Sequence, residues 1–378
     1  IGNAGGPFVL ALDSPWGSGK TTLIKMLMTV LIKQKHCCVY FNAWDVDYVQ
    51  DPIVPLVAAL EQVDLGESQA AAEFKKRMRA VRGITTIIAK RLIIGGLKAA
   101  TVGVLDIDRT TEAIAADGAE NTAQDVVSAY EKGRNLVDQF HRNLDVAVKQ
   151  LVAAERKPPL VVFVDELDRC RPDFALMTLE RIKHLFDVRD VQFVLSIDRD
   201  QLANSMKAVY GEGLNTDEYL RRFIDLDFAV PNAPQRPYVE SLLGRFDLGP
   251  AFSARNHPEL REDREIFLDL FTALSEALDL SLRVQERCFT RFCIVMEQTP
   301  NDHYLHPALV VALIILRSKD PGLFARLMRN EAATEEVMQL FKKTPAGFRF
   351  WRSRTGFWLE AQLLASDPDE ERRERDLR

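Results

Sequence analysis

The chain has 378 residues, of which 47% are hydrophobic and 28% are charged, and its formal net charge is −6. This length suffices for one large α/β domain and a smaller region, and the composition is that of an ordinary globular protein. The acidic balance argues against a general nucleic-acid coat but leaves binding through a local basic groove open.

The chain shows no sign of a membrane span or of a metal-binding cysteine cluster. Its most apolar stretch, residues 84–107, is interrupted by Lys90, Arg91 and Lys98, so we expect no transmembrane segment. The five cysteines are odd in number and lack zinc-ligand spacing, which predicts reduced, mostly buried thiols in a cytoplasmic protein.

The first part of the chain alternates strand and helix patterns. The apolar run Phe8–Asp13 predicts a buried strand, and helical spacing follows over residues 20–35. Residues 37–41 predict a second strand, after which Asp51 and Pro52 form a helix-opening pair. This alternation predicts an α/β fold with a parallel sheet, whose first part we assign to residues 1–63.

The middle and end of the chain are mostly helical. Residues 64–157 have helical spacing and predict an insertion, after which strands are expected at 160–164, 191–195 and 223–230 within a second core part, 158–235. A proline-rich exit marks the boundary to a helical, lid-like region, 236–378, with strong helix patterns at 265–278, 282–296 and 307–316. No internal repeat is recognised.

A glycine-rich segment lies between the first strand and the first helix, as a phosphate-binding loop requires. Gly17 and Gly19 allow the backbone amides to approach phosphates, Lys20 is placed to reach the terminal phosphates, and the Thr21 hydroxyl is placed to bind Mg²⁺. Ser14 stands where the usual pattern has glycine, which predicts altered loop geometry more than loss of binding. The candidate nucleotide-binding residues here are Ser14, Trp16, Gly17, Ser18, Gly19, Lys20, Thr21 and Thr22.

An acidic pair, Asp165 and Glu166, follows the apolar strand at 160–164. At the carboxyl end of a buried strand, Asp165 is expected to hold Mg²⁺ and Glu166 to orient and deprotonate water. The alternative is that the pair only caps the next helix.

Further candidates lie downstream. Ser196 or Asp198 is expected to sense the terminal phosphate, although Asp198 is equally suited to cap the following helix. Arg221 or Arg222 is a candidate arginine finger acting across a subunit interface, with surface ion pairing as the alternative. Arg283 is a candidate to close over the nucleotide, and a solvated basic stripe is the alternative.

The sequence resembles the KAP family of P-loop NTPases. The resemblance rests on Trp16–Thr21, Phe41–Trp44, Phe163–Cys170, Phe193–Arg199 and Tyr219–Phe223, and it covers about residues 8–235. It implies an ATPase with an additional catalytic strand between the two nucleotide motifs. It also makes Asp168 and Arg169 candidates for coupling the acidic strand to its neighbours. Two departures stand out: family members often have Asp-Asp where this chain has Asp-Glu, and many carry transmembrane helices in the interval that here is charged.

The sequence therefore predicts Mg²⁺-dependent ATP hydrolysis that drives a conformational or assembly switch. The absence of a guanine-reading motif favours ATP. A homo-oligomer or a partner protein is expected, and the resemblance alone raises a role in antiviral defence. The alternatives are a scaffold that binds nucleotide without hydrolysing it and, less favoured, a small-molecule kinase.

Overall fold

The structure is a computed structural model that describes residues 8–94, 123–254, 263–300, 303, 305–329, 331 and 334–366. It divides into two compact units. The first comprises the described residues up to Pro231 except Trp16–Gly19, and the second comprises Trp16–Gly19 and the described residues from Asn232 onwards. We describe each unit by itself.

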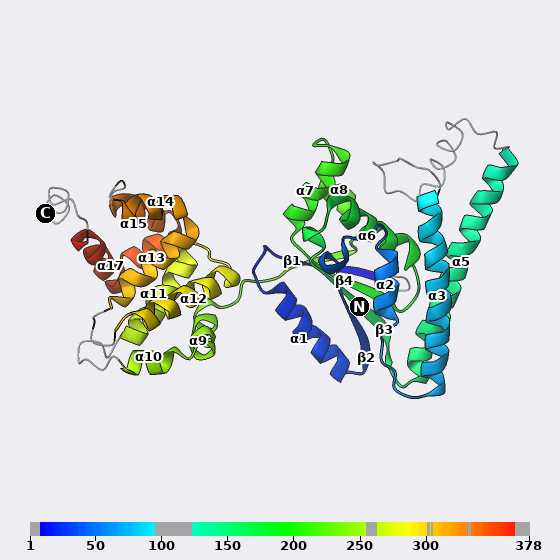
Figure 1. Cartoon of the computed structure of the whole chain (residues 1–378), viewed down its shortest axis with the longest axis horizontal. Helices are drawn as coiled ribbons and strands as arrows, with labels where there is room; N and C mark the ends of the chain where they lie inside the picture. The colour runs from blue at the N-terminus through cyan, green and yellow to red at the C-terminus, as the bar shows by residue number, and fades with distance from the viewer. Residues whose placement is uncertain are drawn as a thin grey trace. The chain divides into compact units, whose positions relative to one another are not determined.

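The first unit is built on a five-stranded sheet with the order β2-β3-β4-β1-β5, in which all neighbouring strands are parallel (Figure 1). The strands are β1 (Phe8–Asp13), β2 (His36–Asn42), β3 (Lys157–Asp165), β4 (Val191–Ile197) and β5 (Leu226–Ala229). β4 therefore lies between β1 and β3, the strands that carry the two nucleotide motifs. This confirms the predicted α/β class with an additional strand between those motifs.

Buried apolar side chains explain why these segments form the inner strands. All seven residues of β4 are buried, as expected for a strand covered on both faces. Leu12 and Phe163 pack with Ile24 of α1 in one apolar cluster, and a larger cluster joins the sheet to α2, α3, α5 and α6. Each cluster excludes water from one face of the sheet, which stabilises the strand pairing.

Seven α-helices of the first unit are described, and in Figure 1 α3 and α5 run side by side as the longest pair. They are α1 (Lys20–Lys33), α2 (Ile53–Leu60), α3 (Gln69–Ile94), α5 (Ala123–Ala153), α6 (Pro172–Leu185), α7 (Arg199–Tyr210) and α8 (Thr216–Leu220).

The second unit is helical over its described residues, and it has its own core of buried phenylalanine, leucine and isoleucine side chains. Phe267 packs against both Phe289 and Phe292 at the centre of this core. Its helices are α9 (Gln235–Arg245), α10 (Leu248–Ala254), α11 (Asp263–Ala277), α12 (Leu282–Gln298), α13 (Pro307–Lys319), α14 (Pro321–Met328), α15 (Thr334–Lys342), α16 (Pro345–Trp351) and α17 (Arg354–Ala365).

Several predicted boundaries shift by a few residues. The strand expected at 223–230 is shorter, because the amides of Phe223 and Ile224 donate back to the Leu220 carbonyl and these residues do not join β5. The helix expected to begin at Pro52 begins at Ile53 instead, where the Ile53 amide donates to the Asp51 carboxylate over 3.0 Å. Such shifts are ordinary at element ends.

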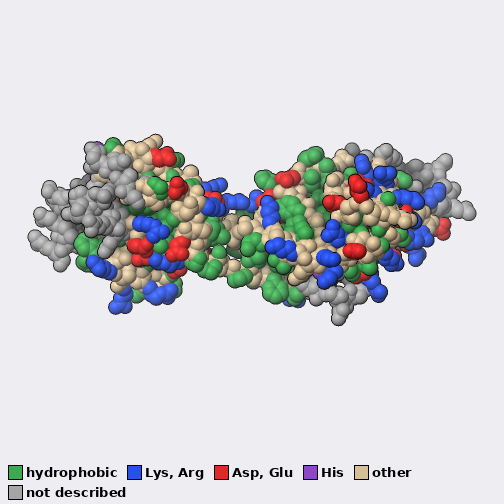
Figure 2. Space-filling model, turned by 90° about the horizontal axis from the view of Figure 1, so that it is seen from below, with side chains coloured by type: hydrophobic (Ala, Val, Ile, Leu, Met, Phe, Trp, Pro, Cys, Tyr) green, Lys and Arg blue, Asp and Glu red, His purple; other side chains and the backbone are tan. Residues whose placement is uncertain are grey.

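Surface and cysteine properties follow the composition. Within the described ranges, no helix combines the length and apolar character needed to cross a bilayer. Basic and acidic side chains are interspersed on the face drawn in Figure 2. All five cysteines are free, and Cys37, Cys170 and Cys288 are buried.

Candidate functional site

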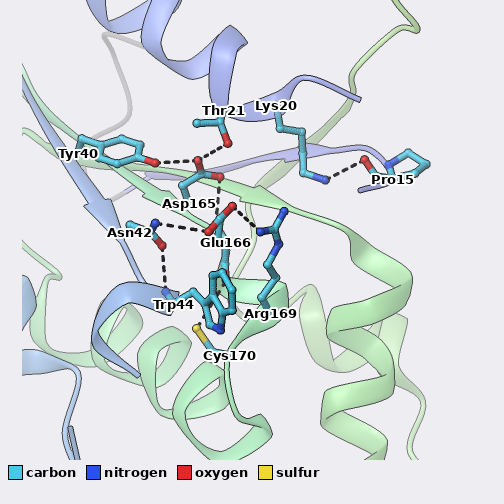
Figure 3. A network of polar contacts seen from close by, with 10 residues as sticks. All are labelled: Pro15, Lys20, Thr21, Tyr40, Asn42, Trp44, Asp165, Glu166, Arg169 and Cys170. Carbon is cyan, nitrogen blue, oxygen red and sulfur yellow. Dashed lines mark hydrogen bonds and ion pairs between the residues drawn. The ribbon is translucent and has the colours of Figure 1, made fainter. Parts of the chain in front are cut away.

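The carboxyl ends of β1, β2, β3 and β4 bring the candidate residues together at one edge of the sheet (Figure 3). The strand register pairs Asn42 with Asp165, and Asp165 with Ser196. On the other side of β4, Asp13 of β1 pairs with Ile197. Ligands of open parallel sheets bind outside this edge, so the polar ends of four strands form the candidate site.

The loop between β1 and α1 has the backbone that a phosphate cradle requires. Gly17 and Gly19 have φ angles of 83° and 96°, a region that side chains with a Cβ rarely adopt. At the start of the loop Ser14 is buried, and its amide donates to the Ile197 carbonyl over 3.2 Å. Ser14 is thus accommodated in the position where the usual pattern has glycine. Along the rest of the loop Trp16 is exposed and Ser18 is half-buried, and Thr22 in the first turn of α1 is exposed.

Lys20 opens α1 and is 9% exposed. Its ammonium group donates back to the loop, to the Ser14 carbonyl and, over 3.3 Å, to the Pro15 carbonyl. Burial lowers the pKa of Lys20, and four nearby carboxylates oppose that shift. The four belong to Asp168, Asp198, Asp13 and Asp165. The Ser14 and Pro15 carbonyls therefore hold the cation against the loop, and a phosphate would replace these two contacts.

Asp165 lies at the end of β3 and is 1% exposed. Its Oδ2 accepts hydrogen bonds from the Thr21 hydroxyl over 2.7 Å and from the Tyr40 hydroxyl over 3.0 Å. Its Oδ1 accepts from the Glu166 amide over 3.0 Å. The direct contact between Thr21 and Asp165 brings together two oxygen ligands of the kind that Mg²⁺ prefers, so the residues present fit a Mg²⁺ site.

Glu166 has a left-handed backbone, with φ of 59°, in which its two carboxylate oxygens have separate partners. Oε1 lies 2.7 Å from Nη1 of Arg169, and Oε2 accepts from the Asn42 amide over 3.4 Å. Asn42 is fixed in turn, because its Oδ1 accepts from the Trp44 amide over 3.1 Å. The carboxylate is therefore aimed by residues of β2 and of the turn that follows β3.

The turn after Glu166 is held by two further contacts. The Arg169 guanidinium lies over the Trp44 ring, 5.5 Å from its centroid. The Cys170 thiol contacts the Glu166 carbonyl, and burial raises the pKa of Cys170 to about 12. Cys170 is thus a buried, unreactive thiol that packs under the site.

The remaining candidates lie apart from this cluster or have structural partners. Asp198 caps α7, since its carboxylate accepts a hydrogen bond from the Gln201 amide over 3.2 Å. Its charge also acts to raise the pKa of Lys20. The Ser196 hydroxyl is fully buried, and among the described residues it has no hydrogen-bond partner. Arg221 and Arg222 are exposed beyond α8, with Arg222 over the Tyr219 ring. Arg283 is exposed on α12 and is described only within the second unit.

Tyr40 is the site residue that sequence reasoning missed. Its hydroxyl contacts Asp165 across 125 positions of the chain, and within the sequence it looks like any aromatic residue of a strand. The one available signal is its place two residues before Asn42, which puts both side chains on the same face of β2.

The comparisons with known proteins agree with this geometry. The model of the KAP family P-loop domain matches residues 2–247, about two thirds of the chain. An uncharacterized protein of Methanocaldococcus jannaschii is 24% identical over 177 residues, which cover 43% of this chain and 90% of that protein. The family's P-loop domain supports nucleotide binding and hydrolysis in general. On this match the chain belongs to the KAP family of P-loop NTPases.

Proposed function

We propose that the protein hydrolyses ATP in a Mg²⁺-dependent reaction and uses the cycle to drive a conformational or assembly switch. The observation that supports this is the meeting of Lys20, Thr21, Asp165 and Glu166 at one edge of the sheet. A loop for phosphates, a pair of oxygen ligands and an oriented carboxylate are together what phosphoryl transfer to water requires.

The loop supplies the binding energy for the phosphates. Its amides and the positive end of the α1 dipole favour an anion. Lys20 exchanges its contacts with the Ser14 and Pro15 carbonyls for the β- and γ-phosphates. Because the same edge holds several carboxylates, a polyanion needs added positive charge there, and Lys20 supplies part of it.

Thr21 and Asp165 are the residues that would hold Mg²⁺. When bound, the ion offsets the negative charge of the phosphates. Tyr40 donates to the same Asp165 oxygen as Thr21, so it keeps the carboxylate oriented when the Thr21 hydroxyl turns towards the metal. Either Asp198 or the buried Ser196 hydroxyl is the proposed sensor of the terminal phosphate.

Glu166 is the proposed general base. Arg169 and Asn42 each hold one of its oxygens, which fixes the direction from which the carboxylate can accept a proton from water. This oriented carboxylate favours water as acceptor and therefore hydrolysis over a kinase reaction. The weaker Asn42 contact, at 3.4 Å, is the one that an attacking water would replace first.

Contributions from a neighbouring subunit form a further part of the proposal. Arg221 and Arg222 are exposed, as an arginine finger acting on another copy must be. This predicts a homo-oligomer or a partner protein, with Arg283 of the second unit as a candidate to close over bound nucleotide.

The test is phosphate release from ATP and from GTP with Mg²⁺ over a range of protein concentrations. Lys20→Ala and Glu166→Gln should each lower release from ATP at least about a hundredfold, since they remove a phosphate contact and the base. Lys33→Ala, at the exposed end of the same helix, is the matched control and should behave as wild type.

Two results would contradict the proposed ATP hydrolysis. Tight ATP binding without release, together with normal function of Glu166→Gln, would favour the scaffold that binds nucleotide without hydrolysing it. A phosphorylated small product would favour a kinase. Specific activity that rises with concentration would support an arginine supplied across a subunit interface.

A role in antiviral defence is a separate proposal that rests on family membership alone. If it holds, Lys20→Ala abolishes protection of the host cell. Unchanged phage plating on cells that carry this variant would refute it.

A further inference from the structure

A second feature of interest lies in the second unit, over α16 and α17. No acidic residue occurs between Glu336 and Glu360, although the whole chain has a net charge of −6. The same interval contains five cationic residues, and all of its residues are described. They are Lys342, Lys343, Arg349, Arg352 and Arg354.

This interval contains a tandem repeat of nine residues that our sequence analysis did not recognise. Residues 341–349 read Phe-Lys-Lys-Thr-Pro-Ala-Gly-Phe-Arg, and residues 350–358 read Phe-Trp-Arg-Ser-Arg-Thr-Gly-Phe-Trp. Phenylalanine, a cation, a hydroxyl residue, glycine and a second phenylalanine recur at the same five places. The remaining four places differ between the copies, so the repeat is one of residue type more than of identity.

The two copies also have the same local structure. Thr344 caps α16 by accepting from the Gly347 amide over 3.0 Å, and Ser353 caps α17 by accepting from the Gly356 amide over 3.1 Å. Each glycine packs on a carbonyl of the preceding turn, where a Cβ would lie 1.8 Å from Phe341 O and 2.3 Å from Phe350 O, respectively. Substitution of either glycine would therefore displace its helix.

The repeat sorts its aromatic residues into two sets. Phe341, Phe350 and Trp351 are buried in the core of the unit. The second phenylalanine of each copy points outwards: Phe348 is 54% exposed and Phe357 is 65% exposed, and Trp358 beside it is 56% exposed. The core is thus built from the first set, and packing within the unit does not account for the second.

The cations of this interval are available to a partner. Among the described residues, no ion pair involves Lys343, Arg349, Arg352 or Arg354, whereas Lys342 lies 3.5 Å from Glu360. The Arg352 guanidinium lies over the Phe348 ring, 5.8 Å from its centroid. One ring face of the repeat therefore already stacks against a planar cation.

We propose that this basic aromatic surface, formed by Lys343, Phe348, Arg349, Arg352, Arg354, Phe357 and Trp358, binds single-stranded nucleic acid. Unpaired bases stack on exposed aromatic rings while arginine and lysine contact the phosphates, and a repeated module suits a repeating polymer. An anionic membrane is less suited, because the leucines of α17 are buried in the core of the unit and only three large apolar side chains of the interval are exposed, which is a small apolar face for insertion.

The test is a fluorescence anisotropy titration of the full chain with labelled 20-nucleotide oligo(dT) and oligo(rU). We expect binding whose logarithmic salt slope is about −3, because four free cations each contribute about −0.7. Arg349→Ala with Arg352→Ala should reduce the slope by about 1.4. Phe348→Ala with Phe357→Ala should weaken binding at least about tenfold and leave the slope unchanged, since stacking is not ionic.

Arg329→Ala is the matched control, because Arg329 is exposed in the same unit but is paired with Glu331 at 3.1 Å. It should bind as wild type, and circular dichroism should show native helix content for every variant. Equal affinity for oligo(dT) and oligo(rU) would show that the surface reads the shared stacking and phosphate chemistry. A preference for one of the two would show whether the surface binds DNA or RNA.

Four outcomes would overturn the proposal. Three are the absence of binding to either strand, unchanged affinity in both double variants, and tighter binding to a matched duplex than to the single strand. A fourth is binding to phosphatidylserine vesicles, lost in Phe348→Ala with Phe357→Ala, without binding to either strand. That result would assign the surface to a membrane.

Discussion

Glu180 of α6 offers a test of how the first unit responds to pH. The residue is 4% exposed, and among the described residues its Oε2 has no hydrogen-bond partner. Burial raises its pKa from 4.5 to about 7, and Arg181 only partly opposes this shift. The folded protein therefore holds a proton on Glu180 under conditions in which the unfolded chain has lost it.

The consequence for stability follows from proton linkage. Below pH 4.5 both states are protonated, so Glu180 costs nothing. Between pH 4.5 and 7 only the unfolded state releases the proton, so the free energy of unfolding falls as the pH rises. Above pH 7 both states are ionised and the cost is constant. With these two pKa values, the loss between pH 5 and pH 8 is about 2 to 3 kcal/mol.

Glu180→Gln removes the titrating group at nearly constant volume. We expect the variant to gain about 2 to 3 kcal/mol relative to wild type between pH 5 and pH 8, which is about 5 to 10 °C in the melting temperature of a unit of this size. Scanning calorimetry at the two pH values measures it, and on the proposed function the transition of the first unit is the one that Mg²⁺-ATP would move upwards.

Glu212→Gln is the control, since Glu212 lies in the same unit and its side chain is 91% exposed. The stability of this variant relative to wild type should be the same at pH 5 and pH 8. A Glu180→Gln variant whose stability relative to wild type is the same at pH 5 and pH 8 would refute the assigned pKa and the linkage argument with it.

Two further predictions test contacts of the first unit. Asp51→Asn breaks a buried bidentate pair with Arg181, with contacts of 2.9 and 3.1 Å, and should lower the free energy of unfolding of the unit by about 3 to 5 kcal/mol. Calorimetry measures this loss. The control is Asp145→Asn, which removes an exposed pair with Lys149 and should cost about 0.5 kcal/mol or less. Equal effects would contradict the role of burial. Tyr40→Phe removes a hydrogen bond to Asp165 and should raise the half-saturating Mg²⁺ concentration by up to about tenfold at unchanged kcat, measured by phosphate release; an unchanged Mg²⁺ requirement would assign Tyr40 to packing alone.

The α/β class and the chain positions of the strands were predictable because neighbouring residues carry both signals. The apolar run of β3 predicts a strand, and the acidic pair that ends it places Asp165 at the carboxyl edge. The glycines before Lys20 likewise mark a turn between a strand and a helix. In each case a few consecutive residues specify the local structure, so no knowledge of distant contacts is needed.

Contacts between distant residues were decided only by the tertiary structure. Tyr40 and Asn42 approach Asp165 and Glu166 because β2 pairs with β3 in a register that places Asn42 opposite Asp165. The pairing joins residues more than 120 positions apart, and the residue pattern of each β-strand by itself does not specify it. The insertion between the two strands is free to vary in length without changing either strand's own pattern.

The sequence by itself thus determined which segments form the nucleotide edge and which residue types they place there, because backbone preference and hydrophobic periodicity act locally. Only the tertiary structure decided that Glu166 is aimed by Asn42 and Arg169, that Tyr40 supports Asp165, and that the core leaves Phe348 and Phe357 exposed. Those features depend on which side chains fill the space around each residue, and that space is defined only once the elements have packed.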